Sequence, residues 1–514
     1  MSRLGPYIVL LVVLFSACSA RKFVPANERL YTKPEIKYIQ EKKVTYKNIA
    51  SNKVDEIMRP EPNGSLFGSR PKLWIWYKFS KPDEPADSGS WIKRKLGKPP
   101  VYLSQTNPDG IVKAINAALY NKGFFDSYAT WQLKDNGKTA TYIYSINLFQ
   151  PYRIADVEWP KDSSAEITQA IYLDTASTLL RVKRRYDLDR LTDERKRIDD
   201  RLKDKGYYFF GDRYLNYRMD TTLGQRTVKL FVYYKKDAPK TALVPYSIRR
   251  VNVYTNYSLS GDTIPYQEVI VDSVHFYQRT DYLRPLPIKR AIFFSDKKPY
   301  SRTDHNLTLS RLGDLGVFKF VNVKLTVPDS QARVLDVNIQ LTPSPKKSIA
   351  VEITGASKSN NFIGPALNVR FRNRNALKGA ELLVFNIATS FETQFNGPFK
   401  GQYTYEFNPK VELYVPRFIL PGGLVNNKSM FVPKTRFTLD YSYTSRVNYF
   451  NIQSTRFGYG YKWKPNLALD HDLGVFNLTY FNIYKESPAF QNLLGDNLFL
   501  RRRFEKQFIE GITY

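Results

Sequence analysis

The sequence predicts three α+β repeats of strand-helix-helix-strand-strand order, followed by the first strands of an antiparallel transmembrane β-barrel. Three observations support this fold class. A helix that ends at a glycine recurs along the chain, strict alternation of apolar and polar residues replaces the helical period after Pro345, and a signal sequence opens the chain. The 514 residues suffice for three or four domains of about 150 residues each.

The first 18 residues have the layout of a secretory signal peptide. Arg3 gives a positive start, residues 8–15 are apolar, and small residues precede Cys18 at a cleavage position. The apolar run is about half of the length that a membrane-spanning helix needs, which excludes a helical membrane protein. Residues 14–18 resemble a bacterial lipobox, in which the cysteine thiol is acylated with fatty acids such as palmitate. A plain signal peptide with an incidental cysteine is the alternative, and the leaflet that receives the anchor stays open.

One helical element recurs three times and leads each time into a glycine corner. The helices are expected at 111–122, 191–205 and 305–315, and the corners after them are Gly123-Phe124-Phe125, Gly206-Tyr207-Tyr208 and Gly316-Val317-Phe318. A glycine at the end of a helix adopts the left-handed conformation without steric cost, so the chain can reverse into a strand. Two alternating segments, typical of a β-hairpin, follow each corner. A further strand opens the second repeat at 152–159 and the third at 246–254.

This order, with the corner before the second strand, resembles the POTRA module. We therefore expect a signal peptide and lipobox at 1–18 and POTRA-like modules at 19–150, 151–240 and 244–343, the first with an insertion at 64–100. The alternative is that unrelated α+β domains share a common kind of corner.

The region 345–514 alternates between apolar and polar residues. Between Phe437 and Tyr443 the odd positions are Phe, Leu, Tyr and Tyr, and the even positions are Thr, Asp and Ser. Such strands occur in soluble sandwiches and in membrane barrels. Strands of about 9–11 residues, aromatic apolar positions and a charged opposite face favour the barrel. At about 20 residues per strand and turn the region holds about eight strands, so we interpret the barrel as truncated before it closes.

The stretch from Asn361 to Leu382 resembles the first barrel hairpin of the BamA/TamA family of outer-membrane assembly factors, which have POTRA modules and a surface-antigen-type barrel. With the lipobox, the resemblance to the lipoprotein subclass covers nearly the whole chain, although the family's Arg-Gly-aromatic lid motif has no counterpart here. It implies a lipid-anchored protein of the bacterial outer membrane with periplasmic modules. It also implies that the first barrel strand, with Ile349, Val351 and Ile353, forms one side of a seam that admits clients.

Under this hypothesis the modules capture unfolded outer-membrane protein clients by β-augmentation and pass them to the barrel. The partners are then these clients, outer-membrane lipid and lipopolysaccharide, with partner subunits in the periplasm or inner membrane as a further option. A dedicated exporter of protein or lipid with the same architecture is the alternative.

The composition excludes most other function classes. The net charge of +30 suits phosphates of lipid or of nucleic acid, and a nucleic-acid-binding protein is suggested by that charge and the aromatic residues alone. We expect no nucleic-acid partner. A single cysteine and three histidines argue against a metal or other cofactor. The fragment Gly137-Lys138-Thr139 lacks the earlier glycine of a phosphate loop, and His471 between two aspartates fits an exposed turn, so we expect no enzyme.

Overall fold

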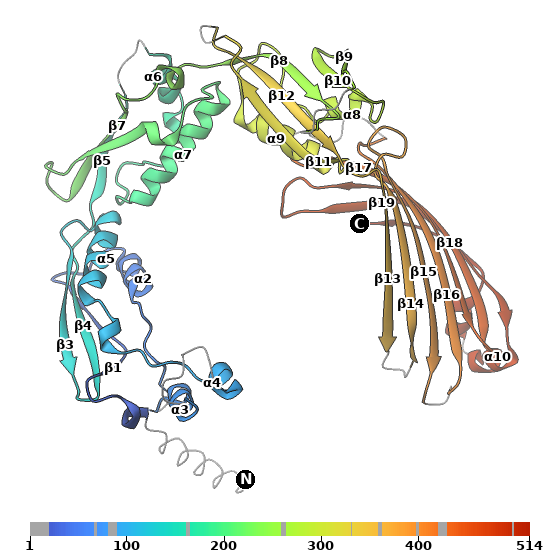
Figure 1. Cartoon of the computed structure of the whole chain (residues 1–514), viewed down its shortest axis with the longest axis horizontal. Helices are drawn as coiled ribbons and strands as arrows, with labels where there is room; N and C mark the ends of the chain where they lie inside the picture. The colour runs from blue at the N-terminus through green and yellow to red at the C-terminus, as the bar shows by residue number, and fades with distance from the viewer. Residues whose placement is uncertain are drawn as a thin grey trace, which may run out of the picture. The chain divides into compact units, whose positions relative to one another are not determined.

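The computed structural model describes residues 20–65, 69–80, 90–160, 165–258, 264–329, 332–357, 362–396, 400–419, 429–495 and 498–514 (Figure 1). Cys18 and the predicted signal peptide lie outside the described residues. The chain divides into two compact units: the first runs to Asp199 and includes Gly211–Ala238, and the second contains Asp200–Phe210 and Pro239–Tyr514. In the described part of the chain, no helix combines the length and the apolar character needed to cross a membrane.

The first module packs two helices on a small mixed sheet, as the alternation and the helical period require. Its central strand β4 pairs in parallel with β1 and β2 and antiparallel with β3. Ile115 and Leu119 of α5 pack with Tyr144 and Ile146 of β4 in a closed core. The two short strands β1 and β2 open the module, and no pattern in the sequence predicts them. The elements are β1 (Leu30–Tyr31), β2 (Glu35–Ile39), α2 (Lys47–Ile57), α5 (Pro108–Asn121), β3 (Tyr128–Asp135) and β4 (Thr139–Asn147).

The expected insertion at 64–100 contains two short helices, α3 (Pro71–Lys78) and α4 (Trp91–Leu96). Leu73 of α3 is buried against Ala20, Val24 and Leu30, so this part of the insertion packs on the start of the described chain.

The second module has the strand order β5-β7-β6, with β5 parallel and β6 antiparallel to the central strand. Its core joins Ile154 of β5, Leu191 of α7 and Val228 and Leu230 of β7. The elements are β5 (Arg153–Glu158), α6 (Glu166–Tyr172), α7 (Leu188–Asp204), β6 (Leu215–Asp220) and β7 (Thr227–Tyr234).

The third module repeats this plan and adds a hairpin. Its sheet has the order β11-β12-β8-β10-β9, in which β10 runs parallel to β8 and β9 forms the new edge. The added hairpin turns at Asp272 and Ser273, both of which have positive φ. The sequence alone does not predict this hairpin. The elements are β8 (Ser247–Tyr254), β9 (Gln267–Val271), β10 (Val274–Gln278), α8 (Pro285–Lys289), α9 (Arg302–Asp314), β11 (Phe318–Thr326) and β12 (Val334–Pro343).

The C-terminal region is one antiparallel sheet of eight strands in sequence order, β13 to β20. In Figure 1 its long strands lie side by side. The strands β13 to β19 have 11 to 16 residues, enough to cross a bilayer when tilted. Among the described strands, β13 and β20 each pair on one side only. The elements are β13 (Lys347–Ser357), β14 (Phe362–Asn373), β15 (Leu382–Gln394), β16 (Tyr403–Val415), β17 (Lys434–Arg446), β18 (Phe450–Trp463), β19 (His471–Glu486) and β20 (Gln507–Thr513).

The predicted fold class of β-α-α-β-β modules followed by a large antiparallel sheet is thus confirmed. Two details differ from expectation. Residues 362–382 contain the second strand of the sheet and the turn after it, whereas the first hairpin is β13-β14. Two short helices that the sequence analysis did not foresee, α10 (Pro488–Leu494) and α11 (Leu498–Phe504), stand between β19 and β20.

Candidate functional site

The first glycine corner lies at the joint between modules 1 and 2. Gly123 has a φ of +84°, and its carbonyl oxygen accepts a hydrogen bond of 2.8 Å from the Tyr152 amide. The Phe125 ring lies on Tyr152 and Tyr186, with ring centroids 4.8 and 5.0 Å apart. A Cβ at Gly123 would lie 2.7 Å from the Tyr186 carbonyl oxygen. This joint therefore needs glycine for space as well as for backbone conformation.

A buried ionic cluster closes the same joint. The Asp187 carboxylate accepts hydrogen bonds from Lys122 Nζ at 2.9 Å and from Arg185 at 2.6 Å, and all three side chains are buried. Burial alone would raise the pKa of Asp187, but the bonds from Lys122 and Arg185 outweigh it and hold that pKa below its usual range. Lys122 also pairs with Asp189, so loss of Asp187 would leave the buried Arg185 charge without its carboxylate partner.

The second corner makes the same joint to module 3. Gly206 has a φ of +102° and accepts a hydrogen bond of 2.8 Å from the Tyr246 amide, and the rings of Tyr208 and Tyr300 lie 4.9 Å apart. Tyr207 and Phe124 are core residues of this corner and of the first.

The third corner is built differently. Gly316 also has a positive φ, of +71°, but open space surrounds the position of its missing Cβ. Val317 and Phe318 point into the core of their own module. The Val317 carbonyl oxygen accepts a hydrogen bond of 2.9 Å from the amide of Ser344, in the short link between β12 and the large sheet.

Modules 2 and 3 have the same backbone contact at the start of the opening strand, which we call the socket. The amide of Lys183 donates to the carbonyl oxygen of Ile154 in β5, and the amide of Lys297 donates to that of Ile248 in β8, each at 2.7 Å. Both lysines have positive φ, 68° and 63°. The sequence offered one signal for this socket, a basic pair two or three residues before a tyrosine, which was too generic to single out. In both modules the socket covers the outer edge of the opening strand at its start.

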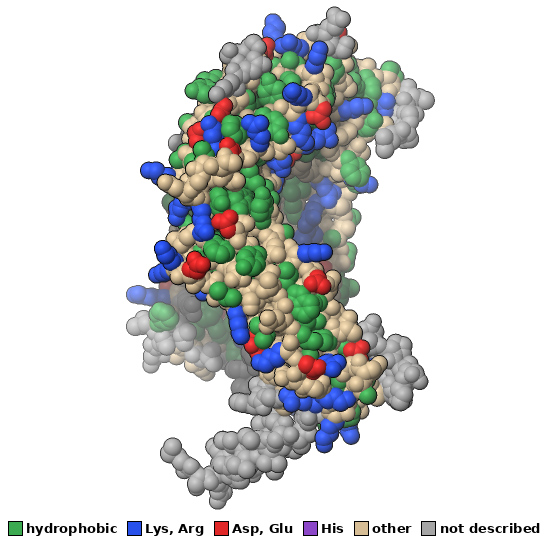
Figure 2. Space-filling view, turned by 90° about the vertical axis from the view of Figure 1, so that its left-hand side faces the viewer, with side chains coloured by type: hydrophobic (Ala, Val, Ile, Leu, Met, Phe, Trp, Pro, Cys, Tyr) green, Lys and Arg blue, Asp and Glu red, His purple; other side chains and the backbone are tan. Residues whose placement is uncertain are grey.

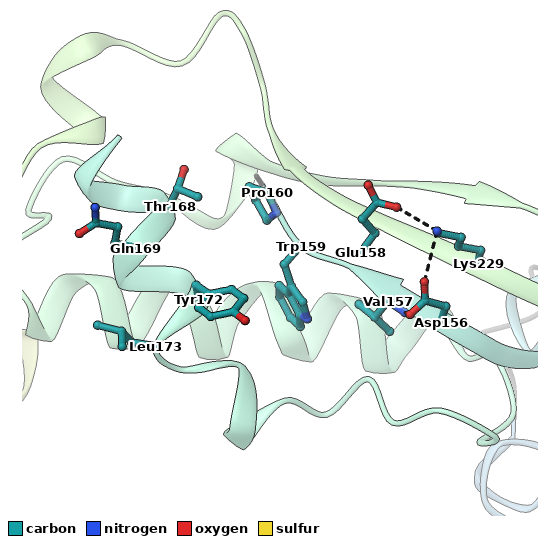
Figure 3. A pocket seen from close by; sticks show the side chains of 10 residues that line it. All are labelled: Asp156, Val157, Glu158, Trp159, Pro160, Thr168, Gln169, Tyr172, Leu173 and Lys229. Atoms are coloured by element: carbon teal, nitrogen blue, oxygen red, sulfur yellow. Dashed lines mark hydrogen bonds and ion pairs between the residues drawn. The ribbon is translucent and has the colours of Figure 1, made fainter. Parts of the chain in front are cut away.

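Module 2 has an open groove beyond its socket. The groove has a volume of about 770 Å³ and lies between the end of β5 and the helix α6 (Figure 3). Figure 3 shows Trp159 and Tyr172 facing its interior from opposite sides, while Lys229 bonds to Asp156 and Glu158 at its polar end, at 3.2 and 2.9 Å. Its lining residues are Asp156, Val157, Glu158, Trp159, Pro160, Thr168, Gln169, Tyr172, Leu173 and Lys229.

The strand after each corner forms an edge of its sheet. The described pairings give β3, β6 and β11 one partner each, so one side of each backbone faces outward. The predicted seam strand is also an edge: the side chains of Ile349, Val351 and Ile353 in β13 are 70%, 62% and 77% exposed. Each of these exposed edges can accept another strand.

The large sheet has a charged face. Cross-strand pairing places Arg370, Lys410, Asp440 and Arg456 in one row across β14 to β18, with Asn386 between the first two. Lys410 bonds to Glu412 at 2.8 Å and Arg436 to Asp472 at 2.7 Å. A hollow of about 490 Å³ lies on this face. Such a row is stable only where water or other charges reach it.

The two motifs set aside on sequence grounds lie in a turn and at the start of a strand. Gly137 is in the hairpin turn between β3 and β4, with a φ of +75°. His471 opens β19 and is stacked with Trp463, with centroids 4.8 Å apart, so an exposed turn is not its setting. Among the described side chains, no group of His, Cys, Asp and Glu could hold a metal ion. Figure 2 shows Lys and Arg spread over the visible face and interleaved with other side chains, without one continuous basic patch.

Comparison with known proteins gives distant structural likenesses. No protein-family model matches the chain, and no curated protein does. POTRA domains 3–5 of BamA from Haemophilus influenzae are 12% identical, covering 62% of this chain and 99% of theirs, with a TM-score of 0.30. BamA from Haemophilus ducreyi lacking POTRA domains 1–3 is also 12% identical, covering 66% and 73%, with a TM-score of 0.32. CdiB from Acinetobacter baumannii is 10% identical, covering 65% and 62%, with a TM-score of 0.24.

Proposed function

We propose that this chain is an outer-membrane assembly factor of the BamA/TamA type, in its lipoprotein subclass, which captures unfolded client strands and passes them to its membrane sheet. One observation is central to the proposal. A module with open strand edges and an eight-stranded sheet with exposed apolar edge residues belong to the same compact unit. A protein that handles strands needs both parts, one to bind a strand and one to receive it.

Capture would use the backbone of the edge strands. The outward N–H and C=O groups of β3, β6 and β11 can pair with any extended segment, so affinity does not depend on a strict sequence. Lysines on β11, such as Lys319 and Lys324, keep this edge from pairing permanently with other folded sheets. Weak and general pairing suits a protein with many clients.

Insertion would use the large sheet and its first strand. The half-exposed apolar side chains, among them Leu439 and Phe457, would face lipid, and the row with Arg370 and Asp440 would face water. The exposed edge of β13 would be one side of a seam at which a client hairpin enters the membrane.

The proposed lipid contacts would fit the same location. Acylation of Cys18 would anchor the chain in the outer membrane with its modules in the periplasm. The positive charge would meet phosphates of lipid and lipopolysaccharide. Partner subunits in the periplasm or inner membrane would assemble on the modules.

Depletion of the protein followed by quantification of the envelope proteome tests this function. Loss of many barrel proteins is the expected result. Loss of one secreted or lipid product, with the other barrels unchanged, would instead identify a dedicated exporter.

Membrane fractionation of the wild type and of Cys18→Ser tests the anchor. We expect globomycin to block processing of the wild-type chain and the substitution to abolish acylation. Co-purification with nucleic acid from the soluble fraction would contradict the proposal.

A further inference from the structure

The opening strands of modules 2 and 3, β5 and β8, pair with their central strands in the same register. In module 2, Ile154 pairs with Val228 and Asp156 with the next residue of β7, so one residue of β5 is bulged out. In module 3, Ile248 pairs with Leu335 and Arg250 with the next residue of β12, with the same bulge. Positions 157–160 of β5 and its continuation are therefore equivalent to positions 251–254 of β8.

In module 3 a strand of the chain itself covers this stretch. Val274 of β10 pairs with Val251, and Phe276 pairs with Val253, in parallel. The Phe276 side chain is fully buried in the module core. The Thr255 amide donates to the carbonyl oxygen of Tyr277 at 3.1 Å, so this side of β8 is hydrogen-bonded as in an ordinary sheet. An apolar residue at every second position of the covering strand thus fills the space beside the opening strand.

Among the described residues of module 2, no strand pairs with this side of the equivalent stretch, and the groove of Figure 3 lies there. Val157, Glu158, Trp159 and Pro160, the equivalents of the four residues that β10 covers, all line it. The Val157 amide, which in module 3 would face the covering strand, bonds to the Asp156 carboxylate at 2.9 Å. The Asp156 carboxylate therefore accepts the hydrogen bond that a carbonyl group of a covering strand would accept.

We propose that the groove of module 2 binds an extended segment of a client protein as a strand parallel to β5, in the place that β10 occupies in module 3. The proposal rests on the proposed function, because it takes an unfolded client as the source of the strand. It names one site, distinct from the edges β3, β6 and β11, and one binding mode.

The strand β10 of module 3 also indicates which side chains the bound segment should have. A side chain at the position of Phe276 would enter the groove between Trp159 and Tyr172, which favours a large apolar or aromatic residue. A side chain at the position of His275 would lie beside Glu158, which is bonded to Lys229, and this favours a polar residue. The expected pattern is apolar-polar-apolar, the alternation of a β-strand. The volume of the groove is in the range of ordinary ligand sites, about 300–1,000 Å³.

A peptide with the sequence of this chain's residues 272–280 is the matched probe. Its binding to the full chain in lipid nanodiscs can be followed by fluorescence anisotropy, and the backbone contact by hydrogen exchange at residues 157 and 159. We expect the peptide to bind and to slow exchange at these amides. We expect the same peptide with Phe276→Ser to bind about tenfold more weakly, because it loses the apolar side chain that fills the groove.

Two substitutions in the protein localise the binding. Leu173 lines the groove and is 78% exposed, so Leu173→Arg leaves the fold intact and should weaken peptide binding by about tenfold. Leu223 is also exposed but lies in the turn between β6 and β7, away from the groove, so Leu223→Arg should leave binding unchanged.

Three results would overturn the inference. If the peptide binds equally well to Leu173→Arg and exchange at 157 and 159 does not change, strands are captured elsewhere, and the proposed function stands without this site. If neither this peptide nor an unfolded barrel protein binds the chain, the proposed function fails as well. If the chain alone forms a dimer that Leu173→Arg abolishes, the groove is occupied by a second copy and not by a client.

Discussion

The strands β12 and β17 share the same alternation and meet different surroundings. In β12 the alternate residues Leu335, Val337, Ile339 and Leu341 are all fully buried in the core of module 3. In β17 the equivalent residues, Phe437, Leu439, Tyr441 and Tyr443, all remain partly or largely exposed. Alternation therefore specifies that a strand has two faces. Alternation does not specify what lies against the apolar face. Helices from the neighbouring sequence can cover it, or a solvent other than water can.

The largest expected effect compares one substitution in both regions. Phe276→Ala in module 3 should reduce the free energy of unfolding of that module by about 3–5 kcal/mol, because a fully buried ring is lost and a cavity remains. Phe457→Ala on the apolar face of β18 should cost about 1 kcal/mol or less, because no packed core collapses around a side chain that is 43% exposed.

Hydrogen exchange of the full chain in nanodiscs measures the two effects region by region. Equal losses of protection in module 3 and in the sheet would show that the apolar face of the sheet has a packed core of its own. The comparison between the two regions would then be wrong.

The second prediction tests which face of the sheet meets lipid. Leu439 and Thr438 are neighbours on β17 with side chains on opposite faces. In vesicles, Leu439→Arg should cost about 2–4 kcal/mol, the penalty for an arginine that faces the middle of a bilayer, and Thr438→Arg should cost much less. The measurement is the denaturant concentration needed to unfold each variant. A larger penalty for Thr438→Arg would reverse the assignment of the two faces.

The sequence predicted the parts of the fold that depend on local patterns. The helix ends at Gly123, Gly206 and Gly316 were visible because a helix that reverses into a strand favours glycine. The alternating strands after Pro345 were visible from their period of two, whereas the number of about eight came from length alone and the helices α10 and α11 before β20 were missed. Each of these signals lies within about ten residues of chain.

Long-range features were missed for a physical reason. In the added hairpin only β10 alternates, and β9 has no such pattern. The turn at Asp272-Ser273 lacks the glycine that marks such turns, and the place of the hairpin in the sheet depends on pairing with β8. The joints at Gly123 and Gly206 depend on amides about 30 or 40 residues farther along the chain. The groove of module 2 is defined by what module 3 has in the same place, and no local pattern encodes that.

The third prediction compares two corners that have the same backbone conformation. Gly316→Ala should cost about 1 kcal/mol, because only the left-handed conformation is strained and space is free around it. Gly123→Ala should cost about twice as much, because its Cβ would also collide with the Tyr186 carbonyl oxygen and loosen the joint. Limited proteolysis between modules 1 and 2 should detect the second variant alone. Equal costs for the two substitutions would mean that the joint between modules 1 and 2 accommodates the added Cβ without further loss of stability.

The smallest effect concerns pH and should be confined to the modules. Burial and the nearby Arg302 lower the pKa of His305 from its ordinary value of 6.5, and the ring is held by the Tyr300 hydroxyl at 3.3 Å. The unfolded chain therefore binds this proton more readily than the folded chain. Stability is complete above pH 6.5 and falls as the pH drops from there toward the lower folded-state pKa.

Hydrogen exchange at one pH on each side of 6.5, corrected for intrinsic exchange rates, should show weaker protection of module 3 at the lower pH. In His305→Gln this difference should shrink, because the amide side chain stays neutral at both values. A loss of protection that is as large in β13 to β19 as in module 3, or that persists in His305→Gln, would assign the pH response to other groups. The pH dependence of protection would then not distinguish module 3 from the large sheet.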